Sequence, residues 1–165
     1  MEHDLTSLAK IFERLGADDP EGWARSQIEE GLPQLHRYLF LAQAWTLVAG
    51  EDDDSWIDAA VARYRQKPDA PYAGAGRALE RMLALGVATS DIVDLVRAMQ
   101  AELLFGICDL LDDPDLDGPE HERLDDLGWP LVTTGPDFEP TSERIAGLHE
   151  SVLETDPTGR EMRPR

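Results

Sequence analysis

Two stretches of this chain are apolar around most of a helical circumference, and they constrain the fold more than any other feature. The first spans residues 33–49, and the second lies within residues 92–112, where residues 101–111 are almost continuously apolar. A helix with apolar side chains on all sides is typical of a protein interior. Neither stretch reaches the ~20 residues that a transmembrane helix needs. We therefore expect these to be the two most buried helices of a helical bundle.

Shorter segments with helical spacing surround these two stretches. Residues 5–15 place apolar side chains three and four apart and end before Gly16, which suits a left-handed helix cap. Asp19-Pro20 favours a second helix start, because Asp caps a helix and Pro fits its first turn. Two further helices are predicted over residues 56–65 and 71–85. The sequence thus predicts a mainly all-α fold, a helical bundle of five or six helices.

The last third of the chain is different in character. Residues 112–128 are rich in Asp and Glu and contain two prolines, which predicts an irregular acidic connection. Residues 129–134 are predicted to be extended, and Gly135-Pro136-Asp137 favours a turn, so one small β-hairpin with part of residues 138–145 is allowed. We expect two parts of one domain: a helical bundle (1–128) and a C-terminal extension packed on it (129–165), with the hairpin, a short helix and a basic tail.

The charge of the chain limits its partners. Its 165 residues include 34 Asp and Glu against 15 Lys and Arg, a formal net charge of -19. Nucleic acid is not expected as a partner, because binding to phosphates needs clustered cations. A basic protein is expected instead, since opposite charge speeds association. One cysteine and an acidic N-terminus without an apolar core predict a bacterial-type protein of the cytoplasm, with no disulfide framework and no signal peptide.

One segment partly resembles the start of a calcium loop. Asp113, Asp115 and Asp117 alternate and are followed by Gly118, which places hard oxygen ligands at the first, third and fifth positions. The twelfth position is Leu124, where a bidentate Glu is expected. The segment therefore predicts either a weak Ca²⁺ site or an acidic loop that ends the preceding helix. Calcium is the only metal that the sequence suggests, and we predict no other cofactor.

Polar residues within the two apolar stretches are candidate catalytic groups. His36 lies in the first stretch and Glu102 in the second, and Gln43 shares a helix face with His36. A buried carboxylate facing a histidine can form an acid–base pair. The alternative is that His36 and Glu102 lie at the edges of their buried faces, or satisfy each other structurally.

A further polar cluster lies near the C-terminus. His149 and Glu150 are adjacent and are followed by Glu154 and Asp156. The second histidine of the zinc-protease motif His-Glu-x-x-His is absent, and no two of the four histidines have the spacing of a local zinc motif. His149 and Glu150 are therefore candidates for a catalytic site assembled by folding, or for part of an interface.

Two function classes follow from these observations. The leading hypothesis is a non-catalytic protein-binding module, such as an inhibitor or an immunity-type protein that blocks a basic partner. The alternative is a small enzyme with a polar pocket between the central helices, which would be cation-dependent if the Asp113–Asp117 loop binds a cation. A pocket in which His36, Glu102 and His149 converge would favour the enzyme. The sequence leaves the oligomeric state open.

Overall fold

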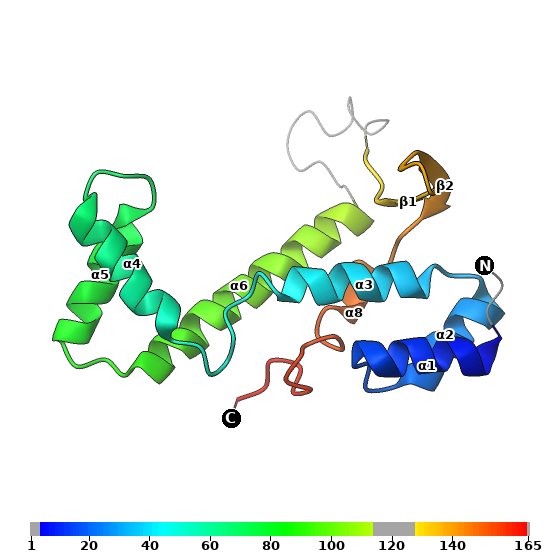
Figure 1. The fold of residues 1–165 in the computed structure, drawn as a ribbon, viewed down its shortest axis with the longest axis horizontal. Coiled ribbons are helices and arrows are strands. Elements are labelled where there is room, and N and C mark those ends of the chain that lie inside the picture. Colours follow the sequence, from blue (N-terminus) through cyan, green and yellow to red (C-terminus); the bar gives the residue numbers. More distant parts are fainter. Residues whose placement is uncertain (1–3, 114–127, 165) are drawn as a thin grey trace. The chain divides into compact units, whose positions relative to one another are not determined.

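The computed structural model describes residues 4–113 and 128–164. It is mainly α-helical with one small two-stranded sheet, which confirms the predicted fold class (Figure 1). The chain divides into two compact units, one formed by residues 1–47 and 102–165 and the other by residues 48–101. No helix within the described ranges has the length and apolarity needed to cross a membrane.

The first unit begins with a helix pair whose ends follow the sequence signals. Helix α1 (Leu5–Leu15) is capped by Asp4, whose carboxylate accepts from the backbone N–H of Ser7 at 2.9 Å, and it ends at Gly16 with φ +88°. Helix α2 (Pro20–Glu30) is capped by Asp19. Such side-chain caps satisfy N–H groups that have no partner inside the helix. Local chemistry therefore fixes both helix starts.

An aromatic cluster joins these helices to α3 (Gln34–Trp45). The rings of Phe12, Trp23 and Tyr38 have centroids 5.3 to 5.9 Å apart, in stacked and edge-to-face pairs. Phe12 and its neighbour Leu8 are completely buried. Aromatic pairs of this geometry add to the stabilisation that burial itself supplies. This cluster is the core of the N-terminal part of the unit.

The predicted hairpin is present. Strand β1 (Val132–Thr134) pairs antiparallel with β2 (Pro140–Arg144), with Val132 opposite Arg144 and Thr134 opposite Pro140. The turn between them is closed by a hydrogen bond from the Gly135 N–H to the Glu139 carbonyl at 2.9 Å. A short helix, α8 (Leu148–Ser151), follows. The Trp45 indole N–H holds this C-terminal segment to α3 through the Val152 carbonyl, at 3.0 Å.

The second unit contains α4 (Ser55–Gln66), α5 (Ala73–Ala84) and the first part of α6 (Thr89–Asp112). A Cβ atom on Gly76 would lie 2.3 Å from the Ala60 carbonyl oxygen, so only glycine allows α4 and α5 to approach this closely. The core of this unit is aliphatic and consists of Ile57, Val61, Leu79, Ile92 and Val93.

The two long apolar stretches differ from their predicted form. The apolar stretch 33–49 is helical only to Trp45, and beyond this end the Ala49 N–H donates to the Gln100 side chain while the Ala49 carbonyl accepts from Arg97. The stretch within α6 is buried along one face only. Its opposite face exposes large apolar side chains, since residues three and four apart share a face of a helix. These exposed side chains are Leu95, Met99, Leu103, Ile107 and Leu110.

Candidate functional site

The structure pairs His149 of α8 with Asp112, the last residue of α6. The His149 Nδ1 atom lies 2.7 Å from Oδ2 of Asp112, and the His149 backbone N–H donates to the same oxygen at 2.9 Å. The Asp112 side chain is 6% exposed and that of His149 is 31% exposed. Because a carboxylate oxygen only accepts, this contact places a proton on Nδ1 and fixes the orientation of the ring. Asp112 and His149 therefore form an oriented acid–base pair.

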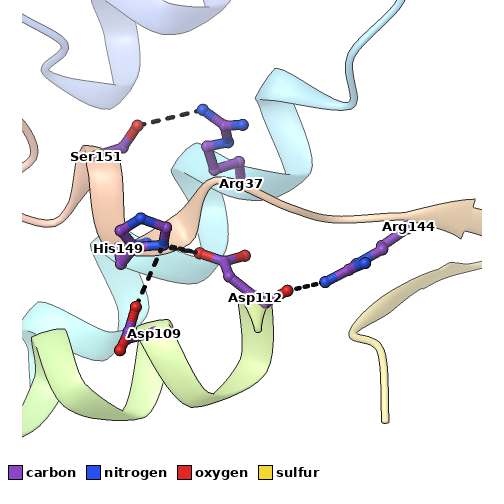
Figure 2. Close-up of polar contacts among 6 residues, drawn as sticks. All are labelled: Arg37, Asp109, Asp112, Arg144, His149 and Ser151. Carbon is purple, nitrogen blue, oxygen red and sulfur yellow. Dashed lines mark hydrogen bonds and ion pairs between the residues drawn. The ribbon is translucent and has the colours of Figure 1, made fainter. Parts of the chain in front are cut away.

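Two more groups contact this pair. Asp109 Oδ1 lies 4.0 Å from Nδ1 of His149, and the Phe105 ring packs edge-on against the imidazole with centroids 5.9 Å apart. Arg144 of the hairpin donates to the backbone carbonyl of Asp112, as Figure 2 shows. The C-terminal end of α6 is thus the point where helix, hairpin and α8 meet.

Arg37 of α3 contacts the segment 147–151, which contains His149. Its guanidinium donates to Ser151 Oγ at 3.3 Å (Figure 2). A Cβ atom on Gly147 would lie 2.2 Å from Arg37 Nη2. Burial lowers the pKa of Arg37, although the surrounding carboxylates, Glu150 first, oppose this effect. Arg37 therefore docks the segment 147–151 against α3, with its guanidinium occupied by structural contacts.

The remaining catalytic candidates do not join this pair. His36 and Glu102 are both exposed on their helices, as is Gln43, and Glu150 is exposed beside His149. None of these four residues, nor His149, lines any of the three cavities that we describe, of about 540, 330 and 480 Å³. Of the four predicted catalytic residues, His149 is the one that the described structure pairs with a partly buried carboxylate. Its partner Asp112 was not predicted; the only signal was an acidic residue at the end of an apolar helix. Glu154 and Asp156, which follow His149 in the sequence, line the cavity of about 330 Å³ instead, and the buried Asp156 carboxylate accepts hydrogen bonds from Thr158 and from the Met162 N–H.

The predicted calcium ligands are only partly described. Asp113 is exposed directly after α6, whereas Asp115 and Asp117 lie outside the described residues. Among residues 4–113 and 128–164, no group of three or more His, Cys, Asp and Glu side chains is placed to hold a metal ion. The calcium site stays a prediction.

Cys108 lies one turn before Asp112 and is fully buried. Burial raises the pKa of its thiol to about 11, and the negative charge of Asp112 adds to this effect. The thiolate is the reactive form of cysteine, so Cys108 is not an activated nucleophile at neutral pH. Its role is that of a small core residue, as the sequence predicted.

A second candidate site is an exposed apolar surface on the last turns of α6. Leu103, Ile107 and Leu110 are spaced by four and three residues, which places them along one face of the helix. Trp129 lies next to the last of them, since its indole N–H donates to the Leu110 carbonyl at 3.0 Å. The four residues are 64%, 44%, 48% and 40% exposed. We call Leu103, Ile107, Leu110 and Trp129 the α6 surface.

The charges near the α6 surface are mostly negative. Residues 102–113 contain four carboxylates and no Lys or Arg. Glu102, Asp109 and Asp113 are exposed and lie along one edge of the row by helical spacing, whereas Asp112 is turned toward His149. Arg144, whose guanidinium is bound to the Asp112 carbonyl, places a positive charge at the end of α6. The arrangement is an apolar row with acids along one edge, which is suited to contact with an apolar surface that has cations along one edge.

Comparisons of this chain with protein-family models, with curated proteins and with solved structures found no match.

Proposed function

We propose that this chain is a non-catalytic binding protein whose partner is a basic protein. The observation that supports the proposal best is the α6 surface, where four large apolar side chains stay exposed on an acidic segment. Exposed apolar residues in a contiguous group are typical of interaction sites, and Trp is enriched where binding energy is concentrated. The net charge of -19 favours a basic partner over an acidic one and raises the rate of encounter.

An inhibitor or an immunity-type module of the bacterial cytoplasm fits this proposal. Such a protein works by occupying a surface of its target, so it needs an exposed contact face and no reaction centre. The cytoplasm keeps thiols reduced, which agrees with Cys108 as the single, unpaired cysteine of the chain.

Site-specific photo-crosslinking tests the proposal. A photoreactive residue at position 107 is expected to give crosslinks to a basic protein in the native host, and the yield is expected to fall as salt screens the charges. The matched control has the same residue at Leu47, which is 81% exposed but lies outside the α6 surface. Equal products from both positions, or an acidic crosslinked protein, would count against the proposal.

The Asp112–His149 pair supports a second candidate function, acid–base catalysis. With Nδ1 bound to Asp112, Nε2 is the atom left to accept a proton, and no hydrogen bond to it occurs within the described ranges. A histidine oriented in this way by a carboxylate can act as a general base. The test is turnover of p-nitrophenyl acetate and p-nitrophenyl phosphate by the purified chain and by His149→Gln and Asp112→Asn. Turnover by the wild-type chain that both variants lose would support the enzyme. If the wild-type chain shows no turnover, or if the variants keep it, the pair does not act as a catalyst on these substrates.

A further inference from the structure

We infer that the α6 surface receives an amphipathic α-helix with a basic polar face, contributed by the partner. The inference rests on the proposed function and names the element of the partner that α6 contacts. Three features support it: the shape of the apolar row, the position of the acids beside it, and the charge of the whole chain.

The shape of the row matches a helix. Leu103, Ile107 and Leu110 follow one line along α6, and Trp129 is bound to the backbone of α6 at Leu110. Side chains spaced by three and four residues form ridges that fit between the side chains of a second helix. An amphipathic helix that docks on a helical surface presents apolar anchors with the same spacing. The row is therefore complementary to one apolar stripe of a partner helix.

The acidic residues beside the row favour a partner helix whose polar face is basic. Glu102 and Asp109 are seven residues apart, so both lie along the same edge of the row, and Asp113 continues that edge. Lys and Arg side chains on the partner helix can lay their aliphatic stems over the apolar row and bring their charges to these carboxylates. Acidic residues on the partner would instead face like charges, which disfavours that pairing.

A second copy of this chain is a poorer occupant. Two copies would bring together two rows of acids and two net charges of -19, and the repulsion between them opposes association. The charge of the chain thus selects a basic helix over self-association, although the apolar row alone would suit both.

The experiment measures binding of synthetic peptides to the purified full chain by calorimetry. The probe is a helix of about 18 residues, or five turns, with Leu at positions spaced by three and four and Lys elsewhere. One control peptide has the same composition in an order that gives no apolar stripe, and a second has Glu in place of Lys. We expect one-to-one binding of the Leu/Lys helix, which weakens as salt rises from about 50 to about 300 mM, and at least tenfold weaker binding of both control peptides.

Two pairs of variants locate the contact. Ile107→Gln with Leu110→Gln is expected to weaken peptide binding by about tenfold or more, since burial of apolar side chains supplies the contact energy. Leu47→Gln with Leu85→Gln removes two exposed apolar side chains elsewhere and is expected to leave it unchanged. Glu102→Lys with Asp109→Lys is expected to weaken binding more than Glu13→Lys with Glu29→Lys, which changes the net charge equally. Circular dichroism confirms that each variant is folded.

The outcomes separate the inference from the proposed function. If the Leu/Lys helix does not bind, or binds equally to both apolar double variants, the inference is wrong. Crosslinking of a basic protein at position 107 would then still support the proposed function. If the chain instead dimerises and Ile107→Gln with Leu110→Gln dissociates the dimer, a second copy occupies the α6 surface and the inference is overturned.

Discussion

The Nδ1 atom of His149 lies 2.7 Å from Oδ2 of Asp112, a residue 37 positions earlier in the chain. The same carboxylate oxygen accepts the backbone N–H of His149, so a single nearly buried group receives two hydrogen bonds from α8. The contact ties the C-terminal segment to the end of α6. It is the basis of the first prediction.

Replacing Asp112 by Ala is expected to lower the free energy of unfolding by about 2 kcal/mol, because hydrogen bonds to a charged group contribute about 1.5 to 3 kcal/mol. The control is Asp109→Ala, whose carboxylate is 60% exposed and 4.0 Å from the imidazole. An exposed pair of this kind contributes at most about 1 kcal/mol. Urea unfolding of both variants measures the loss of unfolding free energy. Equal losses would show that the Asp112 contact stabilises the fold no more than the Asp109 contact does.

Gly147→Ala is expected to destabilise the protein more than Gly16→Ala. Both positions have a left-handed backbone, which disfavours a residue with a Cβ atom by roughly 1–2 kcal/mol. At Gly147 the new methyl group would also meet the Arg37 guanidinium at 2.2 Å, whereas nothing lies within 4 Å of the same position on Gly16. Thermal unfolding of the variants, and of Gly147→Ala with Arg37→Ala, tests this. If truncation of Arg37 recovers no stability, the steric explanation is wrong.

The Cys108 thiol is expected to react slowly with Ellman's reagent at pH 8 in the folded protein and rapidly in urea, because it is buried and its raised pKa keeps it protonated. Its ordinary pKa is near 9.0 and its folded pKa is about 11. The folded state therefore holds this proton more tightly, and its contribution to stability is full below pH 9 and declines as the pH rises toward 11. The difference between the wild type and Cys108→Ala in unfolding free energy against pH isolates this contribution. A difference that does not vary between pH 8 and 11 would contradict the raised pKa.

Phe12→Ala is expected to lower the free energy of unfolding by about 3 to 5 kcal/mol, as truncation of a buried aromatic side chain leaves a cavity. Phe12 is completely buried among the rings of Trp23 and Tyr38. Leu39→Ala, by contrast, truncates a side chain that is 39% exposed and is expected to have a smaller effect. Chemical denaturation of both variants measures the difference, and similar losses would place Leu39 in the core instead of at its edge.

The melting temperature is expected to rise as salt increases from about 20 to about 200 mM, because screening reduces repulsion within a chain of net charge -19. Calorimetric scans in sodium and potassium chloride distinguish general screening from the binding of one ion. A melting temperature that is flat across this range would indicate that the carboxylates are already dispersed or paired.

Local sequence signals predicted most of the helices well. The first helix stops at Gly16 and the second starts at Asp19-Pro20, as expected, because caps depend on residues within one turn of the chain. The hairpin turn at residues 135–139 also depends on local chemistry. The end of α3 at Trp45 is not predicted by the local pattern, and the backbone beyond it is bound at Ala49 by the side chains of Gln100 and Arg97, which lie far along the sequence.

The sequence by itself determined the helical class, the helix starts and the acidic charge, because propensity, capping and composition act over a few residues. Only the tertiary structure decided which face of α6 is buried. Apart from the edge marked by Glu102 and Asp109, the segment 101–111 is apolar on every side, so its pattern does not say which of its apolar residues are buried. Packing leaves Leu103, Ile107 and Leu110 exposed and covers Leu104 and Cys108. The tertiary structure likewise decided that His149 pairs with Asp112 and not with a residue of its own cluster. Pairing across 37 residues depends on where helix ends meet in space, and no local spacing in the sequence encodes that meeting point.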